Sequence, residues 1–243
     1  MTYFKLTETN KVQKFITLIK TIKLFNDYIS FIFDSNKLYI QGMDGSHICL
    51  YEININKDWF DEYNYTNDQS QIIMSCVSSI MNKILSLSKT NQGITIGFND
   101  NNCEKINIDI YDILLKDSSD SQENKNINEK NFEINCIDID FDLLTPDEID
   151  YDVDLYINSK ELSNYFSELI QFGEDIYINC ESNLLKLSSL SGDNSMVQKL
   201  SFDQIERYEV VEDYNIKTKY QLNYLNAIWL YNTGIVLLLA VCV

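Results

Sequence analysis

Residues 41–50 read Gln41-Gly42-Met43-Asp44-Gly45-Ser46-His47-Ile48-Cys49-Leu50 and contain the chain's only histidine. A strand-like run, Leu38 to Ile40, precedes this stretch, and a second, Tyr51 to Ile55, follows it. Two glycines punctuate the segment between the runs, which predicts a loop that joins two β-strands. The sequence therefore presents His47 between two β segments.

The composition bounds the class of protein. A chain of 243 residues allows one large domain or two of moderate size, and 45% hydrophobic content with 16 Tyr and 12 Phe indicates a globular fold. The formal net charge of −18 argues against a nucleic-acid partner, because phosphate binding draws on Lys and Arg. That argument weakens if the basic residues gather on one face, since distant charges are screened in salt.

Several kinds of chemistry find no support in the sequence. The six cysteines have no C-x-x-C spacing and no signal-peptide pattern opens the chain, which favours reduced thiols in a cytosolic or nuclear compartment. The run Asp138-x-Asp140-x-Asp142 begins like a calcium loop but continues with Leu143 where glycine is required. We expect no metal, no cofactor and no catalytic activity. The apolar tail Gly234 to Val243 is too short to span a membrane, which takes about 20 residues.

An internal repeat gives the organisation of the chain. Ser35-Asn36 and Ser182-Asn183 lie in similar strand-like surroundings, and an amphipathic helix pattern precedes each pair. A second helix candidate follows each copy, Ser79 to Leu87 in the first and Asn223 to Tyr231 in the second. The sequence thus predicts two copies of one α+β unit, with a polar stretch and an acidic linker between them.

The residues around His47 resemble the central loop of the proliferating cell nuclear antigen (PCNA) family, the DNA polymerase sliding clamps. The family has a glutamine, a small residue, Met-Asp, two small residues, His, and then alternating apolar residues, and all of these types occur here in that order. The resemblance implies an α+β DNA clamp fold of two topologically similar domains, with helices lining a ring interior and antiparallel sheets outside. The expected boundaries are 1–136 for the N-terminal domain, 137–157 for the connecting region and 158–243 for the C-terminal domain.

The first predicted helix, Asn10 to Ile22, carries several lysines, which taken alone indicate the solvated face of an amphipathic helix. The resemblance implies that Lys14 and Lys20, with Lys83 on the second helix, line the inner channel. Such contacts hold phosphates without reading bases, as a sliding protein requires. The first helix of the second copy has Asn164 and Ser167 where the family has arginines, so the channel is expected to be less basic there.

A lone histidine is ordinarily a structural or surface residue, and no second histidine exists to form a zinc site with His47. The resemblance implies instead a pocket for partner peptides that insert aromatic anchors. Its members by position are Met43, His47, Ile48, Leu50, Leu143, Pro146 and Tyr151.

The resemblance further implies a homotrimeric, non-enzymatic ring that encircles double-stranded DNA and tethers DNA polymerase and other replication or repair proteins, with a clamp loader as a further partner. The segments expected to pair between subunits are Asn128 to Cys136 and Gly192 to Leu200. Two alternatives stay open: a subunit of a heterotrimeric checkpoint clamp, and a monomeric peptide-binding module. The expected location is the nucleus, or a cytoplasmic replication site if the source is viral.

The sequence departs from the family pattern after Asn226. An apolar run to Val243 stands where relatives continue through a further hairpin, a strand and a tail. The second domain is therefore expected to be truncated, with a short sheet and an exposed edge.

Overall fold

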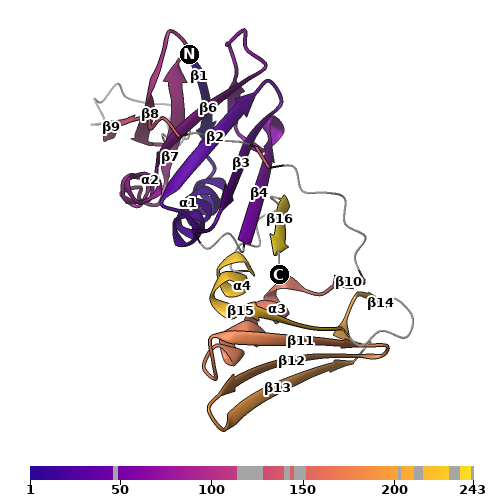
Figure 1. Cartoon of the computed structure of the whole chain (residues 1–243). Coiled ribbons are helices and arrows are strands. Elements are labelled where there is room, and N and C mark those ends of the chain that lie inside the picture. The colour runs from indigo at the N-terminus through magenta and orange to yellow at the C-terminus, as the bar shows by residue number, and fades with distance from the viewer. Residues whose placement is uncertain are drawn as a thin grey trace. The chain divides into compact units, whose positions relative to one another are not determined.

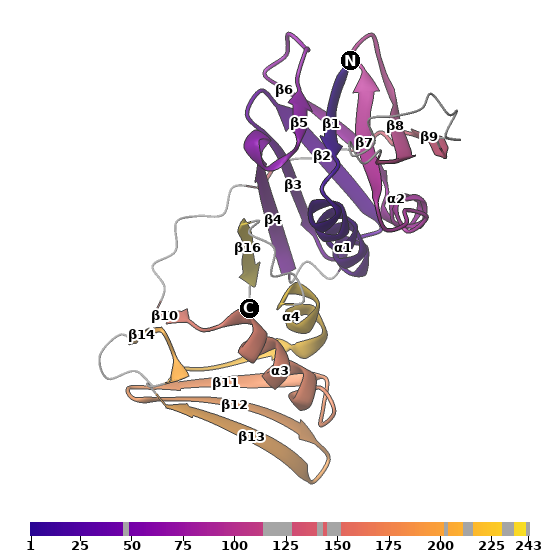
Figure 2. The same ribbon diagram turned by 180° about the vertical axis from the view of Figure 1, so that it is seen from behind.

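The computed structural model describes residues 1–45, 49–113, 128–139, 143–144, 152–201, 204–210, 216–229 and 236–241, with the backbone alone at 102, 159, 226–229 and 236–241. The chain forms two compact units, Met1–Leu144 with Thr233–Val243, and Thr145–Asn232 (Figures 1 and 2). The C-terminal domain expected from the sequence, 158–243, includes the strand β16 at 236–241, which the structure groups with the N-terminal unit. No helix of the described residues is long and apolar enough to cross a membrane.

The N-terminal unit contains two five-stranded antiparallel sheets. One has the strand order β5-β1-β7-β8-β9 and the other β16-β4-β3-β2-β6. The elements are β1 (Thr2–Leu6), α1 (Thr9–Phe25), β2 (Tyr28–Asp34), β3 (Lys37–Met43), β4 (Cys49–Asn56), a short 3₁₀ helix (Lys57–Trp59), β5 (Glu62–Asn64), β6 (Gln71–Val77), α2 (Ser78–Leu85), β7 (Gln92–Asn99), β8 (Asn102–Asp112), β9 (Glu129–Asn135) and β16 (Val236–Val241).

The helix α1 forms where the apolar spacing predicts it, and it extends beyond both predicted ends. Its buried face is a continuous apolar stripe: Val12, Phe15, Leu18, Ile19, Ile22 and Phe25. The helix contacts α2 and also strands of both sheets, so the helix pair spans the two sheets along one side of the unit (Figure 2). The exposed residues of both helices therefore share one surface.

Aromatic packing forms the centre of this unit. The ring of Phe4 lies 5.1 Å from that of Phe15, 4.6 Å from that of Phe60 and 6.2 Å from that of Phe33, measured between centroids. Phe4 is fully buried, so β1, α1 and the second sheet are joined through one side chain. Aromatic pairs at such distances add about 0.5–1.5 kcal/mol each to the burial term.

The second unit repeats this order of elements in a shorter form. Its helices rest on a four-stranded sheet, β13-β12-β11-β15, and on a two-stranded sheet, β10-β14. The elements are β10 (Val153–Tyr156), α3 (Ser159–Leu169), β11 (Asp175–Glu181), β12 (Leu184–Ser191), β13 (Asn194–Ser201), β14 (Arg207–Val210), β15 (Ile216–Gln221) and α4 (Leu222–Trp229).

The two units differ in how completely their first sheet is built. In the N-terminal unit β1 lies between β5 and β7, but among the described strands β10 pairs with β14 alone. Val153 and Leu155 on β10 are accordingly only partly buried, whereas Phe4 and Leu6 on β1 are fully buried. The apolar tail forms β16, which pairs antiparallel with β4, from Val236 opposite Asn54 to Val241 opposite Cys49.

Apolar and polar residues alternate over Phe132 to Phe141, which predicts a strand there, but β9 ends at Asn135. The amide of Cys136 donates to the carbonyl of Glu104 at 2.7 Å, and that of Ile137 donates to the carbonyl of Ser75 at 2.9 Å. The chain therefore leaves one sheet and crosses to the edge of the other. The alternating pattern indicates a local preference for a strand, and these two hydrogen bonds outweigh that preference.

Candidate DNA and partner interfaces

The loop after β3 is closed by Asp44. The amide of Asp44 donates to the carbonyl of Cys49 at 2.9 Å, and the amide of Cys49 donates to the Asp44 carboxylate at 2.7 Å. Asp44 is buried, so these hydrogen bonds are shielded from water. The carboxylate thus fixes both ends of the loop that contains His47.

Gly42 leaves room for a neighbouring aromatic ring. It lies opposite Tyr51 in the β3–β4 register, and a Cβ at position 42 would lie 2.3 Å from the Tyr51 hydroxyl oxygen. Because real Cβ atoms do not approach so closely, any larger residue would displace the ring. The small residue after Gln41 in the loop motif therefore has a packing reason.

Gln41 connects this strand to a segment about a hundred residues away. Its side-chain nitrogen donates to the carbonyl of Leu144 at 2.6 Å and to the Glu52 carboxylate at 2.9 Å, and its side-chain oxygen accepts from the Leu144 amide at 2.9 Å. The glutamine is 3% exposed. This pair of hydrogen bonds fixes Leu143 and Leu144, which are 40% and 43% exposed, beside the start of the loop.

The predicted peptide-binding residues fall into three groups. Met43 is partly buried at the end of β3, and Leu143 is exposed and held nearby through Gln41 and Leu144. Leu50 is 5% exposed and belongs to the core in this structure. The remaining members, His47, Ile48, Pro146 and Tyr151, lie outside the described residues. The pocket stays a prediction.

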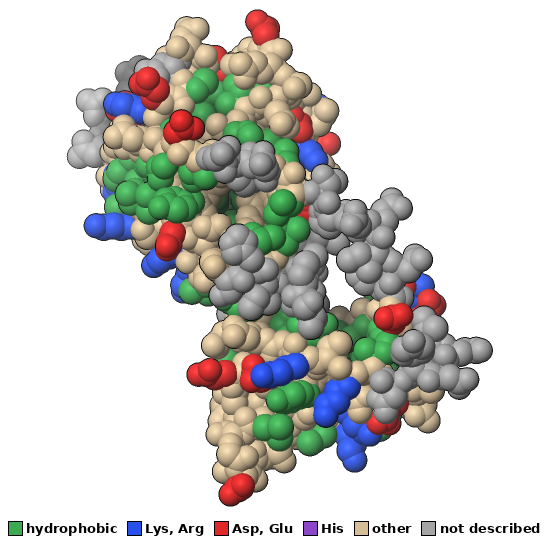
Figure 3. Space-filling view, in the orientation of Figure 1, with side chains coloured by type: hydrophobic (Ala, Val, Ile, Leu, Met, Phe, Trp, Pro, Cys, Tyr) green, Lys and Arg blue, Asp and Glu red, His purple; other side chains and the backbone are tan. Residues whose placement is uncertain are grey.

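The predicted DNA-binding lysines lie on α1 and α2, which pack side by side. Lys20 and Lys83 are exposed on the sides of their helices that face away from the core, and Lys14 is partly buried. Figure 3 shows basic side chains along the part of this unit where Figure 1 places these helices. The helix α1 has four lysines and α2 has one, and neither contains Asp or Glu.

Lys11, the first lysine of α1, has a different environment. Its ammonium lies 2.6 Å from the Asp61 carboxylate and 3.2 Å from that of Glu8. Burial acts to raise the pKa of Asp61, but hydrogen bonds from Lys11 and from the backbone at Thr7 and Glu8 outweigh it and lower that pKa to about 2. Lys11 therefore stabilises the start of the helix.

The second unit has a different charge pattern on its helices. The helix α3 contains Lys160 but also Glu161 and Glu168, and α4 contains no charged residue. Four of the six basic residues of this unit, Lys186, Lys199, Lys217 and Lys219, lie on its four-stranded sheet, and Arg207 lies on β14. Lys186 is opposite Lys199, and Lys219 is opposite Tyr177 in the strand register.

The two segments expected to pair between subunits are both edge strands among the described residues. The strand β9 is at one end of its sheet and β13 is at one end of the second unit's four-stranded sheet. Val197, an apolar residue on β13, is 51% exposed. Both edges are available for strand addition as far as the described chain extends.

A repeated unit of two helices on antiparallel sheets, with lysines concentrated on one helix pair, defines a protein of the DNA-clamp fold. The family model described as "Proliferating cell nuclear antigen, N-terminal domain" matches residues 1–143. The match covers more than half of the chain, so the chain belongs to the PCNA family.

Individual relatives and solved structures agree. Proliferating cell nuclear antigen 1 of Plasmodium falciparum is 26% identical over 201 residues, which are 79% of this chain and 68% of that protein. PCNA from Thermococcus kodakaraensis has a TM-score of 0.77 at 15% identity, covering 98% of this chain and 89% of that one. The PCNA2–PCNA3 complex from Sulfolobus tokodaii gives 0.76 at 18% identity, covering 97% and 87%.

Sequence reasoning missed two features of these interfaces. It did not identify Gln41 as the anchor of Leu144, although the glutamine opens the loop motif. It also grouped Lys11 with the other lysines of the helix, because Asp61 is 50 positions away and nothing local indicates the ion pair. Both contacts join residues that are distant in the sequence, and only the folded chain brings them together.

Proposed function

We propose that the chain is a DNA polymerase sliding clamp, a non-enzymatic processivity factor that encircles duplex DNA and tethers a polymerase and other replication or repair proteins. The observation that carries the proposal is the helix pair α1 and α2. In a chain with a formal net charge of −18, these two packed helices have five lysines and no carboxylate. That distribution suits loose contact with a phosphate backbone.

Lys14, Lys20 and Lys83 are the proposed DNA contacts. Lys20 and Lys83 are exposed, and within the described chain neither forms an ion pair, so phosphates would face no intramolecular competitor. The helices of the second unit add little positive charge. We therefore infer that DNA is attracted mainly to the first unit of each subunit.

Ring closure is proposed to occur by pairing β9 of one copy with β13 of the next. The internal repeat supports this arrangement. The third strand after the first helix is β4 in one unit and β13 in the other, and β4 already has β16 on its outer side. A strand from another copy would cover β13 in the same way, and three head-to-tail contacts would close a ring.

Partner peptides are proposed to bind beside the loop that Asp44 closes, against Met43, His47, Ile48, Leu143, Pro146 and Tyr151. The exposure of Leu143 and Leu144 next to that loop supports the assignment. A clamp loader would be needed to open the ring. The site of action would be the nucleus, or a cytoplasmic replication site for a viral protein.

Light scattering on the purified chain tests the ring. Three chains of 28.4 kDa give about 85 kDa, and we expect that mass. Val197→Asp on β13 is expected to reduce the mass toward one chain, because it places a charge on the pairing edge. Leu190→Asp is the matched control, since Leu190 is also 51% exposed but lies on β12. A single-chain mass for the unmodified protein would contradict the homotrimer.

A second candidate is a subunit of a heteromeric clamp. The observation that favours it is the fold match to a PCNA2–PCNA3 complex, in which two different chains occur together. In that case the chain alone would stay near 28.4 kDa and would assemble only with a second, different clamp chain. A chain that remained monomeric with any clamp subunit and still bound partner peptides would instead be a monomeric interaction module.

A further inference from the structure

At the start of α1 in the N-terminal unit, the side chain of one lysine lies between two carboxylates. Asp61 directly precedes β5, and its amide donates to the carbonyl of Lys5 at 3.1 Å. Its carboxylate accepts from the amide of Glu8 at 3.0 Å and from the ammonium of Lys11 at 2.6 Å. Two carboxylates, Asp61 and Glu8, thus flank one lysine.

The second unit repeats the backbone of this site. Glu206 directly precedes β14, and its amide donates to the carbonyl of Tyr156 at 2.9 Å. Tyr156 is opposite Arg207 just as Lys5 is opposite Glu62, so Glu206 stands in the place of Asp61.

The lysine is not repeated. Lys11 is the third residue of α1, whereas the third residue of α3 is Glu161. Asn158 caps the start of α3, because its side-chain oxygen accepts hydrogen bonds from the amides of Lys160 and Glu161. Where the first unit has a cation between carboxylates, the second unit has two carboxylates, and within its described part neither forms an ion pair.

A pocket of about 420 Å³ occupies this place in the second unit. The pocket opens to solvent, since four of its six lining residues are exposed, and its volume is larger than a lone ion would fill. Its wall combines the two carboxylates with the ring of Tyr165 and the apolar side chain of Ile205. The residues lining it are Asn158, Glu161, Tyr165, Gln204, Ile205 and Glu206.

We propose that this pocket binds a lysine or arginine side chain of a partner polypeptide. The aliphatic stem would lie against Tyr165 and Ile205, and the charged head would reach Glu161 and Glu206, which is how amphipathic basic side chains divide between apolar and polar surroundings. A divalent metal fits less well, because such ions prefer about six oxygen ligands and the described residues contain no group of three Asp, Glu, His or Cys side chains placed to hold a metal ion. The residues that line the pocket include none of the proposed DNA contacts and none of the residues of β9 and β13.

The test uses the full chain and a hexapeptide of alternating glycine and arginine, with the arginines replaced by glutamine in a control peptide. NMR titration should give shifts at Ile205 and Glu206 for the arginine peptide and none for the control. Glu206→Gln should weaken binding at least fivefold. Glu161→Lys should abolish it, because the new lysine recreates the pair that Lys11 forms with Asp61.

Glu168→Lys is the matched control, since it makes the same change of charge on an exposed residue of α3 outside the pocket. It should leave binding within twofold. Equal weakening by Glu161→Lys and Glu168→Lys would mean general attraction to an acidic protein and would overturn the proposal. Absence of binding to the unmodified chain would overturn it too, as would Mg²⁺ that binds the pocket alone and displaces the peptide.

Discussion

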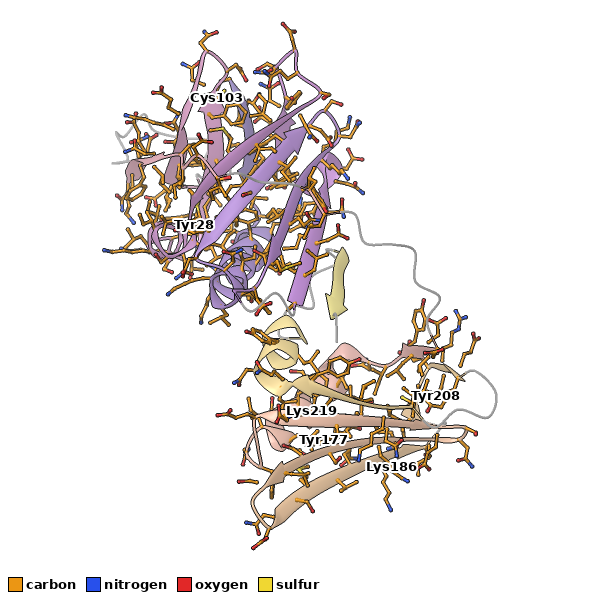
Figure 4. All side chains as sticks on the ribbon, viewed as in Figure 1. Tyr28, Cys103, Tyr177, Lys186, Tyr208 and Lys219 are labelled. Atoms are coloured by element: carbon orange, nitrogen blue, oxygen red, sulfur yellow. The ribbon has the colours of Figure 1, made fainter. Side chains whose placement is uncertain are left out.

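The two units share one architecture but differ in the charge of their helices. In the first unit the helix pair has five lysines and no carboxylate, whereas in the second unit four of the five lysines lie on the outer face of the four-stranded sheet, at Lys186, Lys199, Lys217 and Lys219. Figure 4 shows Tyr177, Lys186 and Lys219 on that sheet, and the ammonium of Lys217 lies 5.5 Å from the Tyr177 ring centroid. The shared architecture therefore determines where the side chains lie, but it does not determine which of them are charged.

The units also differ in how tightly the first strand is packed, and the largest expected effect tests this. Phe4→Ala should destabilise the first unit by about 3–5 kcal/mol, because it removes a fully buried ring with three aromatic neighbours. Leu155→Ala at the corresponding position of the partly covered strand β10 should cost about 1–2 kcal/mol. Amide hydrogen exchange in the full chain separates the two units. Equal losses of stability in the two variants would contradict the difference in packing between β1 and β10.

The next effect concerns DNA. Replacing Lys14, Lys20 and Lys83 by glutamine should weaken duplex binding on the order of tenfold and reduce the slope of log K against log salt by about 3, if each lysine neutralises one phosphate. The matched triple variant on the second unit's sheet, Lys186, Lys199 and Lys217 to glutamine, should change the slope by less than about 1. Fluorescence anisotropy at several salt concentrations gives both slopes. Equal changes of the salt slope in the two triple variants would contradict the proposal that DNA is attracted mainly to the first unit.

The smallest effect compares the two carboxylates that precede β5 and β14. The pKa of Asp61 is lowered to about 2 in the folded chain, so its stabilisation is present above the unfolded value near 3.8 and is lost as the pH falls toward 2. Asp61→Asn should cost about 1 kcal/mol at pH 7, after allowance for solvent screening, and should flatten the acid limb of the stability curve. Glu206→Gln should change neither property, because that carboxylate forms no ion pair with any residue that the structure describes. Urea unfolding between pH 2 and 7 measures both variants.

Local patterns predicted the elements well and their long-range partners poorly. The helix spacing of Val12, Phe15 and Ile19 identified α1, and the alternation around Phe132 identified β9, since both signals lie within one element. The pairing of β16 with β4 and the hold of Gln41 on Leu144 join residues more than a hundred positions apart. Such contacts depend on register and on which edges are free, and no short stretch of sequence encodes them.

The predicted site residues show the same difference between local and long-range signals. Lys20 and Lys83 could be placed because a helical wheel gives their exposed side once the core face is known. The burial of Leu50 could not, because an alternating apolar strand reads the same whether it faces a groove or the core.

The carboxylate-free sequence of α1 and α2 has a consequence for the conditions under which the clamp can work. Neither helix has an acidic side chain, so no carboxylate of its own competes with phosphate for its lysines. Binding of a phosphate backbone to such a surface releases counterions, and it therefore weakens as the salt concentration rises. The strength of DNA binding would follow the ionic strength of the cell.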